Sequence, residues 1–554
     1  MADKSYDAIV IGGGHHGTII APYLAKAGMT VGVFERQDRL GGGAHTEDNS
    51  PALGFKQNFC AEVSRFYGHP AYKDFNLYDE GLHYVAPETG IGIVFDDETS
   101  FVGYPASILV DPKTGEIRYS EENVKKTYDQ IAQFSKADAE TYIDLTEKNK
   151  NKWGQAFSRD RYSSPRGWGE TGAVEELCAD SESGLEPVFK FMNVKQLAHY
   201  FFESPELRIL FIRNAISSVL CQIDDVPGID GLYGTLSISF AWSPPSIPIG
   251  GTQAITDALV SAGKKLGVEY FTDSEVAKVL VENEVAKGIQ LMNGTQIEAK
   301  HLVVADTGIP QLLLGLLGEE FVTPRMRRRL DAILYDRGQL LWGCVAVHES
   351  PQYKAAKSNP DVNKTFRLCW APKDLRYFKD KFWYEICLMG HASRLAPLTI
   401  TDSIWDPTRA PEGKHNVWLE EIACPLRNFG YREWRRLRDD MVENHLLPQW
   451  RQFAPNMTKE NVIATRIYTP VDLFETDSDN IEGGLARGAT ILSQNDCFRG
   501  LPELADYRTP VKNLYMCSSS LPGGQGIARG SSYRCYKAIA EDLGLPRFWE
   551  ERGL

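Results

Sequence analysis

The sequence lacks long apolar runs and an excess of basic residues. The chain of 554 residues contains no uninterrupted apolar run of about 18 residues, so it has no predicted membrane-spanning helix. Its formal net charge is −14, which argues against nucleic acid as a partner because phosphate binding needs clustered lysine and arginine. The first apolar strand starts within six residues of Met1, which indicates no cleavable signal peptide.

Paired cysteine motifs are also absent. The ten cysteines are scattered and none forms a C-x-x-C pair, which argues against a zinc knuckle or a thioredoxin-type site. We therefore predict no metal site. Cys517 and Cys535 lie in apolar surroundings and are expected to be buried free thiols. This cysteine usage suits a reducing, cytoplasmic setting and leaves a peripheral membrane contact open.

A β-α-β unit is present at the N-terminus. The apolar run 7–11 leads into Gly12-x-Gly14-x-x-Gly17, then a helical segment, then an apolar run that ends at Glu35. Glycines at this spacing allow a tight turn, close approach of a pyrophosphate and close helix–strand packing. A carboxylate about 20 residues further on accepts hydrogen bonds from a ribose. The unit therefore predicts dinucleotide binding at a helix N-terminus.

Two further glycine turns follow. The first, Arg39-Leu40-Gly41-Gly42-Gly43, comes directly after the ribose-binding strand, and its glycines let the backbone run close to a flat ligand. The second lies near the C-terminus, where the strand 512–517 leads through Gly523-Gly524-Gln525-Gly526 into a helix from about Ser531. That helix offers a second N-terminus to the same ligand.

The remaining segments predict an interrupted cofactor domain. Ser120 and Ser135 are expected to cap two successive helices, and Asn293-Gly294 predicts a hairpin turn. A helix is expected over 253–266, followed by strands that rejoin the cofactor domain. We expect five segments: cofactor domain 1–118, helical substrate or lid region 119–246, cofactor domain 247–309, substrate domain 310–490 and cofactor domain 491–554.

These pieces, in this order, resemble the phytoene-desaturase-like flavoproteins, which include carotenoid desaturases, carotenoid isomerases and retinol saturase. The resemblance spans nearly the whole chain and is carried by the stretches 12–28, 39–47, 135–142, 248–251, 276, 303–306, 406–415 and 507–526. It implies an α/β fold in which a glutathione-reductase-like Rossmann domain for FAD is interrupted by a mixed α+β substrate domain.

The resemblance also implies which residues bind FAD. The expected set holds the pyrophosphate, adenosine ribose, adenine and flavin ends of the cofactor: Gly12, Gly14, His15, Gly17, Glu35, Arg36, Gly42, Gly43, Val276, Asp306, Ser519, Gly524, Gly526 and Ile527. The chain departs from the family pattern at Gln525, which interrupts the glycines, and at Arg529, which directs a charge towards flavin or substrate. His45 stands where small apolar residues are common.

The predicted reaction is FAD-dependent desaturation of an apolar substrate, isoprenoid, terpenoid or alicyclic. A hydride leaves a carbon next to a double bond for flavin N5, and a proton leaves the neighbouring carbon. His45 and Asp496 are the candidate bases, although flavin alone can suffice in a hydrocarbon pocket. The electron acceptor stays open among quinone, O2 and NAD(P)+, as does oligomerisation.

Three other functions stay open. The same cofactor site serves flavin-dependent cis–trans isomerisation of a polyene. An amine oxidase would place an aromatic cage before the flavin. A flavin-free prenyl-lipid carrier is the alternative from another class, and the intact Gly12, Gly14, Gly17 and Glu35 argue against it.

Overall fold

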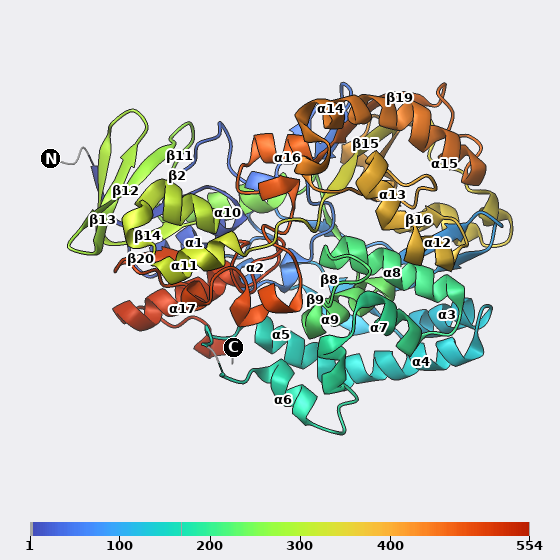
Figure 1. Cartoon of the computed structure of the whole chain (residues 1–554), viewed down its shortest axis with the longest axis horizontal. Helices are drawn as coiled ribbons and strands as arrows, with labels where there is room; N and C mark the ends of the chain where they lie inside the picture. The colour runs from blue at the N-terminus through green and yellow to red at the C-terminus, as the bar shows by residue number, and fades with distance from the viewer. Residues whose placement is uncertain (1–3, 168, 553–554) are drawn as a thin grey trace.

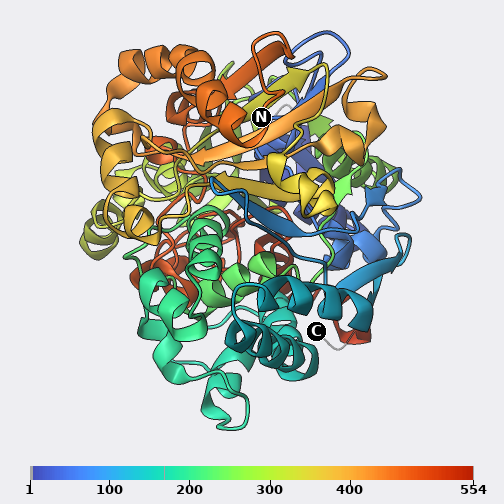
Figure 2. The ribbon, with the colours of Figure 1, turned by 90° about the vertical axis from the view of Figure 1, so that its right-hand side faces the viewer.

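The strands of the chain form two seven-stranded sheets beside a helical region. The structure, a computed structural model, describes residues 4–167 and 169–552. Figure 1 shows the first sheet and its helices on the left, the second sheet at the upper right and helices α3–α9 at the lower right. Figure 2 shows the same helices below the second sheet after a quarter turn.

The first sheet gathers strands from both ends of the sequence. Its order is β11-β2-β1-β14-β13-β12, and β20 pairs with β14. Strands β11, β2, β1, β14 and β20 run parallel, with Ile9 opposite both Gly32 and Val303. The bounds are β1 Lys4–Ile11, β2 Val31–Phe34, β11 Glu269–Phe271, β12 Val276–Glu282, β13 Val285–Leu291, β14 Gln296–Ala305 and β20 Leu514–Met516.

Three helices cover this sheet and place their N-termini at its glycine turns. They are α1 His15–Lys26, α10 Gln253–Lys265 and α17 Ser531–Leu543, and α1 packs against the other two. Parallel strands need helices on both faces, which explains why the strand sequences are continuously apolar. The expected helix near 253–266 and the hairpin at Asn293-Gly294, between β13 and β14, are confirmed.

The second sheet is mostly antiparallel, with the order β19-β15-β18-β17-β16-β6-β7. Its strands are β6 Ile91–Phe95, β7 Ser100–Val102, β15 Leu340–Val347, β16 Arg367–Ala371, β17 Leu398–Ile400, β18 His415–Ile422 and β19 Val462–Tyr468. Three short pairs are β3 Thr46–Asp48 with β4 Lys56–Asn58, β5 Tyr84–Val85 with β10 Ile247–Pro248, and β8 Ser107–Asp111 with β9 Glu116–Tyr119.

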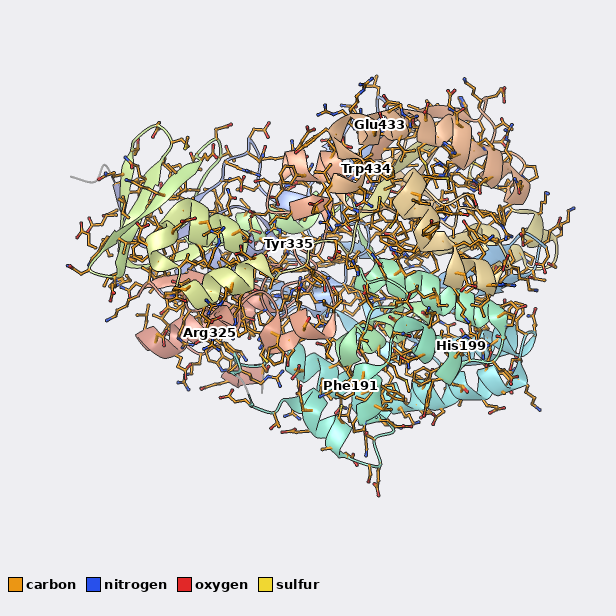
Figure 3. All side chains as sticks on the ribbon, viewed as in Figure 1. Phe191, His199, Arg325, Tyr335, Glu433 and Trp434 are labelled. Carbon is orange, nitrogen blue, oxygen red and sulfur yellow. The ribbon has the colours of Figure 1, made fainter. Side chains whose placement is uncertain are left out.

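The other helices belong to the helical region, to the second sheet or to connections. The helical region holds α3 Glu121–Ala132, α4 Lys136–Lys148, α5 Gly154–Tyr162, α6 Ala173–Ala179, α7 Val194–Phe201, α8 Pro205–Val219 and α9 Gly228–Ser239. The rest are α2 Pro70–Asp74, α11 Pro324–Asp331, α12 Leu375–Asp380, α13 Phe382–Met389, α14 Gly430–Asp440, α15 Leu447–Phe453 and α16 Pro470–Thr476. On α14, Trp434 is buried while Glu433 lies towards the outside (Figure 3).

Local signals in the sequence account for several boundaries. The Ser120 hydroxyl accepts a hydrogen bond from the Asn123 N–H and the Ser135 hydroxyl accepts one from the Asp138 N–H, so both expected caps are confirmed. Cys517 and Cys535 are buried and free, as predicted. Buried apolar side chains form two clusters, one around the first sheet and one shared by the second sheet and the helical region.

Strand pairing differs from the expected segments at one place. The division into five segments stays a prediction as a set of domains, and its residues 1–3, 168 and 553–554 lie outside the described residues. Strands β6 and β7 fall within the predicted cofactor segment 1–118, yet β6 pairs with β16 and β7 in the second sheet. The reason is that β6 is apolar and buried along its whole length, so it requires strand partners, and periodicity does not identify them.

Within residues 4–167 and 169–552, no helix combines the length and apolar character needed to cross a bilayer.

Candidate active site

One cavity of about 1230 Å³ lies where the two sheets and the helical region meet. It exceeds the roughly 300–1,000 Å³ of ordinary small-molecule pockets, so it has room for a cofactor and a substrate together. Its wall includes Gly12, Gly14 and Glu35 from the first sheet, Trp418 from the second, and Tyr233 from the helical region. The N-terminal glycine turn therefore opens into a space that all three regions share.

The first glycine turn is built by close backbone contacts. Gly12 has φ +95°, which L side chains rarely adopt, and its N–H donates to the Phe34 carbonyl over 2.8 Å. A Cβ at Gly17 would overlap the Gly12 carbonyl oxygen. Gly17 is absent from the cavity wall, so its role is to let α1 approach β1. Gly14 lines the cavity at the N-terminus of α1.

The next glycine turn touches the first. A Cβ at Gly42 would lie 3.3 Å from the Gly14 Cα, and Gly41 donates its N–H to the Gly13 carbonyl over 2.8 Å. Gly42 and Gly43 both line the cavity. The two turns thus form one glycine surface, which leaves room for a ligand against the backbone.

The carboxylate of Glu35 is fixed by the backbone. Its oxygens accept the Gly13 N–H over 2.7 Å and the Gln37 N–H over 2.8 Å. A carboxylate accepts about four hydrogen bonds, so capacity for a ribose hydroxyl remains. Arg36 lines the cavity next to it and contacts Asp477 over 3.5 Å. Val276 lines the same end of the cavity.

The C-terminal glycine loop reaches the same place from the other end of the chain. The His16 Nε2 lies 3.0 Å from the Gly524 carbonyl oxygen and 3.4 Å from the Ser519 Oγ. Ser519, Gly526 and Ile527 line the cavity, whereas Gly524 lies behind its wall. The structure therefore brings the two outer glycine motifs together through His16.

The site contains an unsatisfied polar atom that a cofactor would pair. His15 is the first residue of α1 and lines the cavity, and its Nε2 is buried without a hydrogen-bond partner. Burial lowers the pKa of His15 well below its usual value, so the imidazole is neutral. A neutral imidazole can accept from a ribose hydroxyl or donate to a phosphate. With the bare glycine surface beside it, this atom fits a dinucleotide such as FAD.

The carboxyl group of Asp306 occupies the N-terminus of α1. It follows β14, lines the cavity and accepts the Gly17 N–H over 2.9 Å. Burial is the main cause that raises the pKa of Asp306 to about 7, Asp479 and Asp477 raise it further, and Arg487 and the Gly17 N–H oppose the rise. Near neutral pH this carboxyl group therefore holds a proton part of the time.

Asp306 makes the stability of the flavin-free protein depend on pH. An unfolded aspartate releases its proton near pH 4, but folded Asp306 holds it to about pH 7. The free energy of unfolding therefore falls by on the order of 2–4 kcal/mol between those pH values. We expect Asp306→Asn, which still accepts the Gly17 N–H, to flatten this slope in urea titrations at pH 4.5–8. The exposed control Asp257→Asn should keep it, and equal slopes for wild type and Asp306→Asn would contradict the assignment.

Neither predicted base presents a basic atom to the cavity. His45 lines the cavity, but its Nδ1 lies 2.7 Å from the Gly42 carbonyl oxygen and its Nε2 is buried, facing Glu47 at 3.9 Å. Asp496 is absent from the cavity wall and lies 3.6 Å from Arg166. His45 is thus placed to hold the Gly42 turn and Asp496 to pair with Arg166. Sequence spacing gave the position of each residue but not the direction of its side chain.

The sequence interpretation missed an ion cluster next to the nucleotide end. Arg487 lines the cavity and contacts Asp477 over 2.5 Å and Asp479 over 3.8 Å. The three lie in a loop-rich segment with no spacing that singles them out, and only the fold brings them beside Asp306. Arg65 and Arg161 of the wall were missed for the same reason. Over the described ranges, no three potential metal ligands converge.

The sequence comparisons match nearly the whole chain to proteins named as dehydrogenases, desaturases and other oxidoreductases. The model of the NAD(P)-binding Rossmann-like domain family matches residues 10–74. A limonene dehydrogenase chain of Castellaniella defragrans is 25% identical over 99% of this chain and 97% of its own length. Pyridine nucleotide-disulfide oxidoreductase domain-containing protein 2 of Rattus norvegicus is 27% identical over 97% of this chain and 94% of its own length. The 1-hydroxycarotenoid 3,4-desaturase of a Flavobacterium species is 24% identical, over 94% and 96%.

Solved structures share the fold. An oxidoreductase from Methanosarcina mazei superposes with a TM-score of 0.57 at 16% identity, over 96% of this chain and 99% of that one. Cyclohexylamine oxidase from Brevibacterium oxydans gives a TM-score of 0.56 at 15% identity, over 97% and 99%. The predicted α/β class with a Rossmann-type domain is therefore confirmed.

Proposed function

We propose that this chain, a phytoene-desaturase-like, FAD-dependent oxidoreductase, dehydrogenates a C–C bond of a terpenoid substrate. The observation that carries the proposal is the 1230 Å³ cavity, whose wall contains both the glycine turns and a group of aromatic side chains. Relatives named for a monoterpene and for a carotenoid support a terpenoid body for the substrate.

Different residues of the cavity wall would bind different parts of FAD. Gly12, Gly14, Gly42 and Gly43 would let the FAD pyrophosphate lie close to the backbone at the N-terminus of α1, and Glu35 would bind the ribose. When bound, FAD supplies a two-electron acceptor for hydride. Gly526 and Ile527 would lie by the flavin end. The cofactor-binding set is part of this proposal.

The substrate end is walled by aromatic rings. Phe157 of α5 and Tyr233 of α9 stack with centroids 3.9 Å apart, and Trp242 lies 5.8 Å from Tyr233. Such a wall orients a flat hydrocarbon and excludes water, which protects a reactive carbon centre. Because the His45 Nε2 is buried and Asp496 is absent from the cavity wall, the proposed mechanism uses neither of them as the base.

We also propose a quinone or O2 as the electron acceptor, since the sequence has one dinucleotide fingerprint, at Gly12–Gly17. The ten free cysteines support a cytoplasmic location, where an apolar substrate would reach the enzyme by peripheral contact with a membrane.

Anaerobic bleaching of the bound flavin tests the function. The purified protein is expected to be yellow. Limonene, geraniol or a short polyene should bleach its absorbance near 450 nm, which is roughly the loss expected when the bound flavin is reduced. Activity only after pre-reduction would instead support an isomerase. A colourless protein that does not take up FAD would contradict the proposal and favour a carrier.

A further inference from the structure

The cavity wall is positively charged in an acidic protein. It carries ten lysine and arginine side chains against seven aspartate and glutamate side chains, whereas the whole chain has a net charge of −14. Six of the acidic groups already contact protein groups: Glu35, Glu62, Asp306, Glu420, Asp477 and Asp479. Five of the ten basic groups also have a carboxylate partner, namely Arg36, Arg39, Arg367, Arg487 and Arg552. The charge that a ligand could use therefore lies on the other basic groups of the wall, Arg65, Arg161 and Arg529 among them.

Two arginines of this wall come together from distant segments. Arg161 lies in the last turn of α5, and Arg529 lies in the C-terminal loop before α17. The Tyr162 hydroxyl donates to the Ala528 carbonyl over 3.1 Å, and a Cβ at Gly530 would overlap the Arg161 carbonyl oxygen. This packing fixes Arg161 and Arg529 on neighbouring parts of the wall.

Neither guanidinium has a carboxylate partner. Within the part of the chain that the structure describes, no carboxylate oxygen lies within 4.0 Å of a side-chain nitrogen of Arg161 or Arg529. The Nε of Arg161 is buried without a hydrogen-bond partner. Burial, and next the positive charge of Arg161, lower the pKa of Arg529 to about 10, while Asp230 acts in the opposite sense. Neither group therefore has an ion pair within 4.0 Å, and the Asp230 carboxyl group acts on both only from a greater distance.

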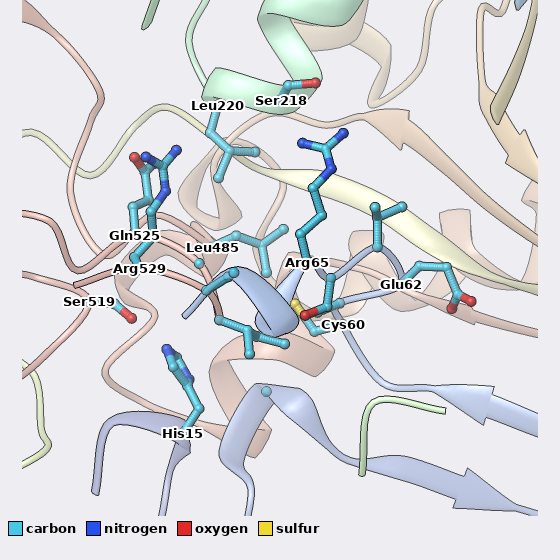
Figure 4. Close-up of a pocket in the computed structure, with 18 of the residues that line it drawn as sticks. His15, Cys60, Glu62, Arg65, Ser218, Leu220, Leu485, Ser519, Gln525 and Arg529 are labelled. Carbon is cyan, nitrogen blue, oxygen red and sulfur yellow. The ribbon is translucent and has the colours of Figure 1, made fainter. Parts of the chain in front are cut away.

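A third arginine lies nearby. Arg65 donates through Nε to the Pro244 carbonyl over 3.0 Å, and it too has no carboxylate within 4.0 Å among the described residues. The charge of Arg161 acts on both Arg65 and Arg529. Figure 4 shows the Arg65 and Arg529 side chains extending towards the side of the cavity where Ser218 and Leu220 lie, away from His15. Arg65 and Arg529 thus extend away from His15, the residue at the predicted pyrophosphate site.

Fixed guanidinium groups next to aromatic rings suit a ligand with two parts. The ring stack of Phe157 and Tyr233 comes from α5 and α9, and α5 also carries Arg161. A guanidinium binds carboxylate or phosphate oxygens through paired N–H groups, and an unpaired buried one is costly. An ammonium group at the same place would be repelled, which disfavours the amine oxidase alternative.

We propose that the substrate carries an oxyanion, a carboxylate or a phosphate, which Arg161 and Arg529 bind beside Arg65 while its terpenoid body lies against the aromatic wall. This rests on the proposed function and specifies its substrate class. The arginines then set the orientation of the substrate, because they hold one end while the reacting carbons lie towards the flavin end.

Titration of the holoenzyme with three related ligands tests the proposal. Geranic acid, geranyl monophosphate and geraniol share a terpenoid body and differ in the head group. We expect at least one anion to perturb the absorbance of the oxidised flavin with a Kd at least tenfold below that of geraniol. The tighter of the two anions identifies the head group. Added salt should weaken anion binding more than geraniol binding.

Variants assign this preference to the arginines. Arg161→Gln should reduce the anion preference at least tenfold, and Arg161→Lys should retain part of it. The control Arg376→Gln, at a side chain that is 92% exposed, should leave the preference unchanged. If Arg161→Gln fails to fold, the wild-type preference and its salt dependence still decide, because they need no variant.

Two results would overturn the proposal. Equal affinity of the wild type for geraniol and for both anions would remove the need for a charged head group. A shift of the flavin midpoint potential in Arg161→Gln with an unchanged anion preference would mean that the arginines act on the cofactor. Because ligand binding can also be followed by tryptophan fluorescence, a colourless wild type would count against the proposed function alone.

Discussion

Gly14→Val is expected to give a folded protein that loses FAD, with a Kd raised on the order of 100-fold or more, about 3 kcal/mol. Gly14 lies at the N-terminus of α1, lines the cavity, and has an extended backbone that tolerates a side chain. A Cβ there would lie 2.7 Å from the Asp306 carboxyl oxygen that accepts the Gly17 N–H, so this carboxyl group must shift. The added methyl groups would fill the expected pyrophosphate position. Equilibrium dialysis of flavin-free protein against FAD gives the Kd.

Gly315→Val is the matched control for this loss. Gly315 has ordinary backbone angles, and a Cβ there would meet nothing within 4 Å. It is exposed and is absent from the cavity wall. We expect this variant to purify with wild-type FAD content and a similar melting temperature. A yellow Gly14→Val protein with full FAD content would refute the assignment of the turn to the pyrophosphate.

Arg409→Met is expected to destabilise the protein by about 3–5 kcal/mol, because it leaves two buried carboxyl groups without their cation. The Arg409 Nη2 lies 2.9 Å from an Asp402 oxygen and 3.4 Å from a Glu62 oxygen, and its Nε donates to the Lys56 carbonyl over 3.2 Å. All three charged side chains are at most 1% exposed. The cluster joins the loop before β18 to Glu62, which follows the second glycine turn and lines the cavity.

Its pH dependence separates this effect from simple loss of packing. Burial raises the pKa of Glu62 and of Asp402, while Arg409 opposes the rise. Without Arg409 both carboxyl groups should bind protons more readily, so the deficit should shrink as pH falls towards 5. Adding Asp402→Asn to Arg409→Met should restore part of the stability.

Arg436→Met is the exposed counterpart. Arg436 also lies between two carboxylates, 2.8 Å from Glu433 and 3.0 Å from Asp440, but its side chain is 64% exposed. Its loss should leave the free energy of unfolding nearly unchanged, because water screens exposed ion pairs. The midpoints of urea unfolding, followed by tryptophan fluorescence, compare the two variants. Equal losses would show that the Arg409 cluster is not a buried charge network.

The sequence predicted features that depend on neighbouring residues. Glycines 12, 14 and 17 are spaced for a strand-to-helix turn, and the Ser120 and Ser135 caps act within three residues, so a linear pattern records them. The sequence could not predict that β6 pairs with β16, because an apolar strand does not specify its partner. Nor could it give the orientation of His45, whose ring nitrogens face Gly42 and Glu47.

The cofactor class and the Rossmann architecture could therefore be predicted from the linear order of residues, since phosphate binding requires a local backbone shape that a few glycines encode. The character of the substrate end emerged only from the three-dimensional packing. Arg65, Arg161 and Arg529 lie in three segments separated by many residues. The sequence singled out Arg529 alone, as a departure from the family pattern, whereas Arg65 and Arg161 resemble ordinary surface arginines. Packing of α5 against the C-terminal loop brings these unpaired charges onto one cavity wall, where they can act together on a ligand. Only the tertiary structure shows this, because electrostatic interaction depends on distance in space and not on distance along the chain.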